Sequence, residues 1–192
     1  SRDDFNKKAR GLAMGWLKVD KMALKAAGCQ LLLHLHKSEK LGPRGTETGV
    51  LASLVEELKL SVEEDAQATP KVLEFALRAA DVMLGEVGSK AKADCQAILG
   101  ISQSLLLVPN AAIKGLSAAL LRTALGALPS ALSDLARFQG LFRAVVDQMQ
   151  AEISLDFGKA LSSLVRALLG AFDLRSIEAA EEDVQGADLP LS

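Results

Sequence analysis

The chain has 192 residues, of which 49% are hydrophobic and only 4% aromatic, and its net charge is −2 at pH 7. With a mean hydropathy of +0.22, this composition excludes general disorder and can supply a full hydrophobic core. A slightly acidic chain lacks the basic field that bulk nucleic-acid binding requires, so we expect no nucleic-acid partner.

Helical periodicity runs through most of the sequence, because apolar residues recur every three or four positions and no segment alternates as a strand would. The first helix is predicted over residues 3–20 and the second over 21–37. A breaker rich in Gly and Pro follows at 41–46. One apolar face of the first helix gathers five residues: Phe5, Ala9, Leu12, Trp16 and Val19.

Six further helices are predicted between caps and breakers. Thr69 and Pro70 form an N-cap followed by Pro at the first helical position. Asn110 caps the helix that follows Pro109, and Asp156 precedes the last helix, which carries the clearest apolar stripe. The predicted segments are about 48–60, 70–87, 90–107, 111–128, 131–154 and 157–173.

Between Cys95 and Ser133 the chain carries only two charges, Lys114 and Arg122, in 39 residues. Such a run is either packed core or a membrane-active element. Each of the two cations would cost about 2.5–3.5 kcal/mol at the centre of a membrane-spanning helix, so a constitutive span is disfavoured. One helix hairpin turned at Pro109, at the centre of a helical core, is the preferred interpretation. Insertion at a membrane remains the alternative.

Short blocks of sequence recur at an offset of 44 residues. Residues 120–128 match residues 164–172, and residues 76–80 fall in the same register. This period lies in the range of HEAT and armadillo repeats, and the chain resembles that class in period and helix pairing. The resemblance implies helical hairpins that stack so that neighbours complete one core. A basic residue recurs at the same place in each block: His34, Arg78, Arg122 and Arg166.

We therefore predict an all-α fold of about eight helices in four antiparallel hairpins, forming a HEAT/armadillo-like right-handed stack. A compact helical bundle is the alternative, because it gives similar spacing. A single domain is predicted over residues 1–177, and the acidic segment 178–192 is predicted to be a flexible tail. The predicted hairpins are about 3–37, 48–87, 90–128 and 131–173.

The recurring arginines are the candidate partner-binding residues. In a structural interpretation, each of Arg78, Arg122 and Arg166 packs its stem at the edge of a core stripe and keeps its head in water. Pairing with a carboxylate of the neighbouring hairpin is a variant of this interpretation. In a functional interpretation, the three form a ladder along one surface, suited to an acidic peptide or a phosphate.

No motif indicates catalysis. The chain has no nucleophile elbow and no phosphate loop, and its acidic clusters fall in apparent linkers. His34 and His36 would point about 200° apart on a helix, so they cannot share a metal. A single axial histidine for a haem or chlorophyll is the remaining cofactor option. We expect no enzyme, no metal and no cofactor, and we expect no small-molecule substrate.

The predicted function is a non-catalytic protein–protein interaction module: a scaffold, an adaptor or a subunit of a larger assembly. The alternative is a membrane-associated or apolar-ligand-binding helical protein that uses the 95–133 hairpin, such as an accessory subunit of a membrane complex. Cys29 and Cys95 form no CxxC pair and indicate reduced buried thiols. With no signal peptide visible, they predict an intracellular location, cytoplasmic or organellar.

Overall fold

Helices account for nearly all of the chain that can be described. The computed structural model describes residues 2–38, 47–63, 70–128, 135–151 and 155–171, and within them it contains α-helices and one short 3-10 helix, with no strand. The all-α prediction is confirmed. The helices are α1 (Arg2–Leu17), α2 (Met22–Ser38), α3 (Glu47–Glu63), α4 (Pro70–Val87), η1 (Gly88–Lys90), α5 (Lys92–Gly100), α6 (Ser102–Leu107), α7 (Ala111–Ala127), α8 (Leu135–Gln150) and α9 (Leu155–Ala171).

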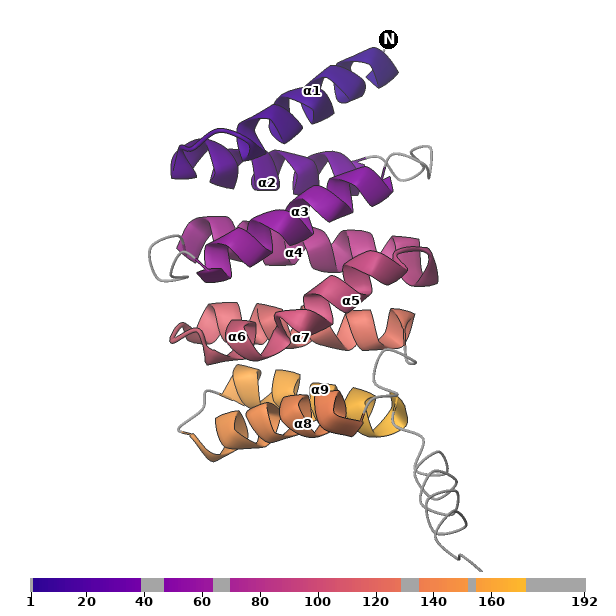
Figure 1. The fold of residues 1–192 in the computed structure, drawn as a ribbon. Helices are drawn as coiled ribbons and strands as arrows, with labels where there is room; N and C mark the ends of the chain where they lie inside the picture. Colours follow the sequence, from indigo (N-terminus) through magenta and orange to yellow (C-terminus); the bar gives the residue numbers. More distant parts are fainter. Residues whose placement is uncertain (1, 39–46, 64–69, 129–134, 152–154, 172–192) are drawn as a thin grey trace, which may run out of the picture.

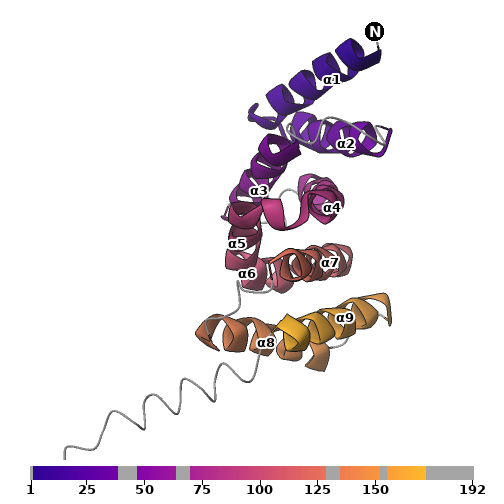
Figure 2. The same cartoon turned by 90° about the vertical axis from the view of Figure 1, so that its right-hand side faces the viewer.

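The helices lie in layers along one long axis, with α1 at one end and α8 and α9 at the other (Figure 1). Seen from the side, α2, α4, α7 and α9 follow one another in a column, and α3, α5, α6 and α8 lie beside them (Figure 2). Within the column, α4 packs against α2 and α7, and α7 packs against α9. Each column helix also packs against a helix that precedes it in the chain: α1 with α2, α3 with α4, α5 and α6 with α7, and α8 with α9.

The core follows the column, where helices are covered on several sides. Helix α4 touches α2, α3 and α7, so it buries residues on several of its sides. Leu73, Leu77 and Leu84 are fully buried, and Ala76 and Met83 are buried as well. Helix α7 is enclosed in the same way by α4, α5, α6 and α9. Leu and Ala supply most of this core, as expected from their high helix propensity.

The segment predicted as one helix over 90–107 is divided in the structure. The 3-10 turn η1 begins at Gly88, whose φ of +58° suits a residue without a side chain. Helix α5 then ends at Gly100 and α6 begins at Ser102. The described residues therefore hold nine α-helices, where about eight were expected. The predicted cap of α7 is confirmed, since Asn110 Oδ1 accepts hydrogen bonds from the backbone N–H groups of Ala112 (3.0 Å) and Ile113 (3.2 Å).

Helix α1 crosses α2 at a point of very close approach. A Cβ at Gly28 of α2 would lie 2.9 Å from the carbonyl oxygen of Ala13 and 3.3 Å from Cβ of Trp16. The side of α1 that carries Ala13 and Leu17 is therefore buried, at 0% and 6% exposure.

The apolar face that the sequence assigns to the first helix is largely turned to solvent. Phe5 is 69% exposed, Leu12 52% and Val19 39%. We call these three residues the end stripe. Two apolar residues at the other end of the layered helices are exposed as well, Met149 of α8 at 44% and Leu169 of α9 at 58%. Phe5 and Leu12 keep the helical period, whereas Val19 lies beyond Leu17, the last residue of α1. Helices at either end of the layered arrangement have fewer neighbours to cover them.

Several predicted features lie outside the described residues: the breaker at 41–46, the cap at Thr69, the first residues of the 131–154 helix and the tail 178–192. The single domain over 1–177 stays a prediction.

Candidate functional site

Three arginines from three neighbouring helices form the candidate site. Arg78 lies on α4, Arg122 on α7 and Arg166 on α9, and these helices pack side by side in the column. All three side chains are exposed, as is His34 on α2. We call Arg78, Arg122 and Arg166 the arginine row. The three arginines thus lie on successive helices of the column rather than around one helix.

Arg78 is held only loosely. Its Nη2 donates a hydrogen bond of 3.0 Å to Glu74 Oε1, one turn earlier on α4, and its side chain is 50% exposed. Exposed pairs at this helical spacing are worth only about 0.3–0.5 kcal/mol. Glu74 therefore does not prevent the guanidinium from turning to a carboxylate of another molecule.

Arg122 joins two helices of the column. Its Nη1 donates to Ser163 Oγ of α9 over 3.3 Å. A guanidinium has five N–H donors, and a hydroxyl engages few of them. This contact orients Arg122 toward α9 without neutralising its charge.

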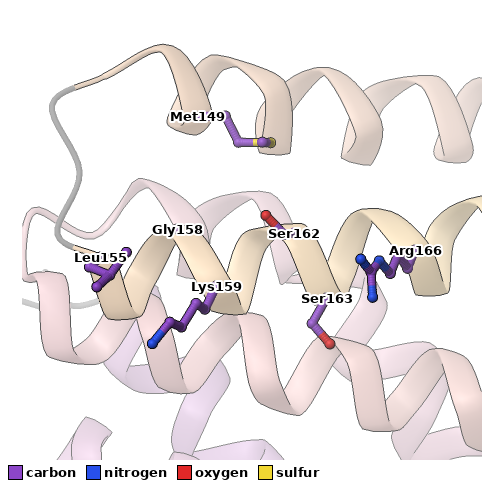
Figure 3. Close-up of a pocket in the computed structure, with 7 residues that line it drawn as sticks. All are labelled: Met149, Leu155, Gly158, Lys159, Ser162, Ser163 and Arg166. Atoms are coloured by element: carbon purple, nitrogen blue, oxygen red, sulfur yellow. The ribbon is translucent and has the colours of Figure 1, made fainter.

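A hollow of about 580 Å³ lies on the surface of α9 (Figure 3). We call it the α9 hollow. Figure 3 shows Lys159 and Ser163 on one side of α9 and Ser162 on the side that faces α8. Its lining residues are Met149, Leu155, Gly158, Lys159, Ser162, Ser163 and Arg166.

The α9 hollow combines positive charge with apolar surface. Lys159 and Arg166 line it, and Met149 and Leu155 supply apolar side chains. None of the lining residues is acidic. Ser163 belongs to the lining and also accepts the hydrogen bond from Arg122. Arg166 therefore lines the hollow, Arg122 contacts one of its lining residues from α7, and Arg78 lies one helix further away on α4.

The hollow was not predicted from the sequence, although a signal for it exists. Lys159, Ser162, Ser163 and Arg166 are spaced at i, i+3, i+4 and i+7, which places them on one face of a helix. The contribution of Met149 comes from α8 and cannot be read from the α9 pattern.

The thiols are poorly suited to nucleophilic chemistry. Cys29 and Cys95 are free and buried. Burial, reinforced by the nearby charge of Glu57, raises the pKa of Cys29 to about 12. Burial also raises the pKa of Cys95, with a further contribution from Asp94, whose own pKa is raised by burial. Both thiols therefore stay protonated at neutral pH, whereas a nucleophilic cysteine acts as a thiolate.

The two histidines differ in exposure and in their contacts. His34 faces solvent on α2, and His36 is buried with its Nε2 3.1 Å from Glu86 Oε1 of α4. Across the ranges that the structure describes, no three His, Cys, Asp or Glu side chains gather as metal ligands would.

The apolar run between Cys95 and Ser133 is largely core. Its described part buries Ile98, Leu105 and Leu106 on the α5–α6 side, and α7 contributes further buried leucines. Among the residues of this run that the structure describes, Leu107 is a large apolar side chain that stays exposed, at 63%. Among the helices of the described segments, none combines the length and the hydropathy needed to cross a bilayer.

Comparison of the chain with protein-family models, with curated proteins and with solved structures finds no match.

Proposed function

We propose that this chain is a non-catalytic protein-interaction module, acting as a scaffold, an adaptor or a subunit of a larger assembly. In this proposal the helices form a HEAT/armadillo-like right-handed stack of four antiparallel hairpins, and the α2–α4–α7–α9 column presents the arginine row to an acidic segment of a protein partner. The observation that carries the proposal is the hydrogen bond from Arg122 to Ser163, because Ser163 lines the same open hollow as Arg166 and so links two arginines of the row.

The arrangement of the helices supports this proposal. Each column helix packs on the next, so positions 44 residues apart in the sequence fall on successive helices, α4, α7 and α9. Stacked helical arrays characteristically use such extended surfaces to bind other proteins. An extended partner segment could then meet one arginine after another along the column.

The chemistry of the site defines the partner. Arginines bind carboxylates through pairs of parallel hydrogen bonds, which gives both affinity and orientation. The exposed apolar side chains beside them are Leu155, 76% exposed, and Met149, whose flexible thioether adapts to varied contacts. A segment that carries carboxylates with an apolar residue between them matches both parts of the hollow.

The burial of the 95–133 run favours this proposal over a membrane or apolar-ligand function. Most of its large apolar side chains within the described residues already fill the core, so using them for lipid would require opening the fold. For location, the free and buried Cys29 and Cys95 support an intracellular compartment, cytoplasmic or organellar.

The test compares two triple variants in which three cationic residues are replaced by Glu, so both change the net charge by the same amount. The row variant carries Arg78→Glu, Arg122→Glu and Arg166→Glu. The control variant carries Lys7→Glu, Lys92→Glu and Arg143→Glu, which are exposed on α1, α5 and α8. Circular dichroism and thermal unfolding establish that both variants fold.

Binding is measured by fluorescence anisotropy with a short labelled peptide of alternating Glu and Leu. We expect the row variant to bind at least about tenfold more weakly than wild type, which equals about 1.4 kcal/mol, and the control to bind nearly as well as wild type. Equal losses in both variants would show only a nonspecific charge effect and would contradict the proposal. So would unchanged binding by the row variant.

A further inference from the structure

Ser163 of α9 lies between two members of the arginine row. Arg122 Nη1 donates a hydrogen bond to its Oγ from α7 over 3.3 Å. Arg166 follows Ser163 by three residues on α9, so the two are neighbours on the helix surface. Figure 3 shows the Arg166 side chain running back along α9 toward Ser163. We call Arg122, Ser163 and Arg166 the α7–α9 cluster.

Two contacts show that α7 and α9 run side by side in the same direction. Lys114 Nζ of α7 lies 5.9 Å from the centre of the Phe157 ring of α9. Eight residues later on α7, Arg122 contacts Ser163. These contacts join residues that are 43 and 41 positions apart. The interval of 44 between Arg122 and Arg166 is close to both, so the two arginines lie at nearly the same level of the column.

The arginines of the α7–α9 cluster lack the counter-charge that the third member of the row has. Arg78 pairs with Glu74, one turn earlier on its own helix. The corresponding positions on α7 and α9 hold Ala118 and Ser162, which carry no charge. Within the described ranges, no ion pair neutralises either arginine of the cluster. Lys159 adds a further cation from the lining of the α9 hollow, so this part of the column is left with unneutralised positive charge.

A phosphate monoester fits the α7–α9 cluster better than a carboxylate does. A carboxylate carries one negative charge, and one guanidinium satisfies it through two parallel hydrogen bonds. A phosphoserine carries about −1.5 to −2 charges at pH 7 and three strong acceptor oxygens. Two guanidiniums, with Lys159 one turn before Ser163, match that larger charge. The Ser163 hydroxyl between them adds a small polar group that leaves room for a phosphate.

We propose that the α7–α9 cluster binds a phosphorylated serine of the partner segment. This inference rests on the proposed function, because it assigns one position of the acidic segment to one place on the column. Met149 and Leu155 of the hollow offer apolar contact to residues beside the phosphoserine. A flat bilayer surface would leave the hollow unfilled, which favours a peptide over a phosphorylated lipid. Binding would then depend on modification of the partner.

Three labelled peptides of alternating Glu and Leu test the proposal by fluorescence anisotropy. They differ only at a central position, which holds phosphoserine, glutamate or serine. We expect the phosphoserine peptide to bind at least about tenfold more tightly than the glutamate peptide. Equal affinity for these two would overturn the phosphate inference and leave the proposed function standing. If wild type binds none of the three, both fail.

Two substitutions at equivalent positions of the repeat locate the phosphate. Arg122→Gln should reduce the preference for phosphoserine over glutamate to less than about threefold, because it removes one guanidinium of the cluster. Arg78→Gln is the matched control and should leave this preference unchanged, because Arg78 lies one helix away on α4. Circular dichroism establishes that the variants fold, and Arg166→Gln repeats the test from α9. Equal effects of Arg122→Gln and Arg78→Gln on the preference would contradict the assignment.

Vesicles distinguish a peptide from a lipid as the source of the phosphate. The flotation experiment uses phosphatidylcholine vesicles that contain phosphatidic acid, whose headgroup is a phosphate monoester. We expect the wild-type chain to remain in the unbound fraction. Flotation that Arg122→Gln abolishes would assign the cluster to a membrane surface and overturn the peptide proposal.

Discussion

At the scale of single residues, a buried ion pair joins α2 to α3. Lys25 is 8% exposed and Glu57 5%, and Lys25 Nζ donates to both carboxylate oxygens of Glu57 at 3.0 Å. Removing two charges from water costs several kcal/mol for each ion, and only good geometry offsets that cost. The pair therefore fixes how α3 lies on α2 more than it adds net stability.

Replacing one member of this pair should be strongly destabilising. We expect Lys25→Met to lower the free energy of unfolding by about 3–5 kcal/mol, because Glu57 is left charged and buried. Urea unfolding followed by circular dichroism measures the loss.

Two controls separate burial from charge loss. Lys25→Met combined with Glu57→Leu should recover most of the stability, since both charges are then gone. Lys59→Met breaks an exposed pair with Glu56, 3.4 Å long with side chains 37% and 62% exposed, and should change stability by less than about 1 kcal/mol. A Lys25→Met protein as stable as wild type would show that the pair is not buried as described.

At the scale of elements, the start of α7 depends on Asn110. Its side chain satisfies two backbone donors at the helix N-terminus. We expect Asn110→Ala to lower the free energy of unfolding by about 1 kcal/mol, and Asn110→Asp to keep nearly wild-type stability because its carboxylate can accept the same bonds. Chemical denaturation of the three proteins measures the difference. If Ala and Asp behave alike, the cap contributes nothing.

The sequence predicts where most helices lie, because caps such as Pro70 and Asn110 act locally. It does not predict the division between α5 and α6. Ile98 and Leu105 keep the helical period across the break, and a single Gly inside a helix costs only about 1 kcal/mol. The two segments have different neighbours, since α5 packs against α3 and α7, and α6 packs against α7 and α8. Tertiary packing of this kind leaves no local signal.

The sequence likewise identifies the residues of the candidate site but not how they lie relative to one another. The 44-residue repeat identifies the three arginines, and each is exposed on its column helix. That Arg122 contacts Ser163, which lines the hollow together with Arg166, depends on the distance between α7 and α9, which periodicity does not contain. Likewise the period identifies the end stripe of α1 but cannot say which elements cover it.

At the scale of the whole molecule, a stack and a compact bundle respond differently to local damage. Leu164 of α9 and Leu32 of α2 are both buried, at 0% and 1% exposure, near opposite ends. Each Leu→Ala change should cost about 2–5 kcal/mol. In a stack, Leu164→Ala should accelerate amide exchange mainly in α8 and α9, and Leu32→Ala mainly in α1 and α2.

Hydrogen exchange followed by mass spectrometry resolves the two cases. The helix pair at the far end from each substitution serves as its internal control and should keep its protection. Uniform loss of protection along the chain in both variants would indicate one cooperative core and would contradict a stack.

The angle at which α1 crosses α2 depends on Gly28 of α2, because a residue with a side chain would not fit at this position. Gly28 lets the Ala13 carbonyl rest against the backbone of α2, and any larger residue there would act as a wedge under α1. Such a wedge would aim Phe5 and Leu12 in a new direction without altering either of them. A substitution at residue 28 would therefore change the geometry of any assembly that uses the exposed face of α1. The residues that make the contact would stay the same.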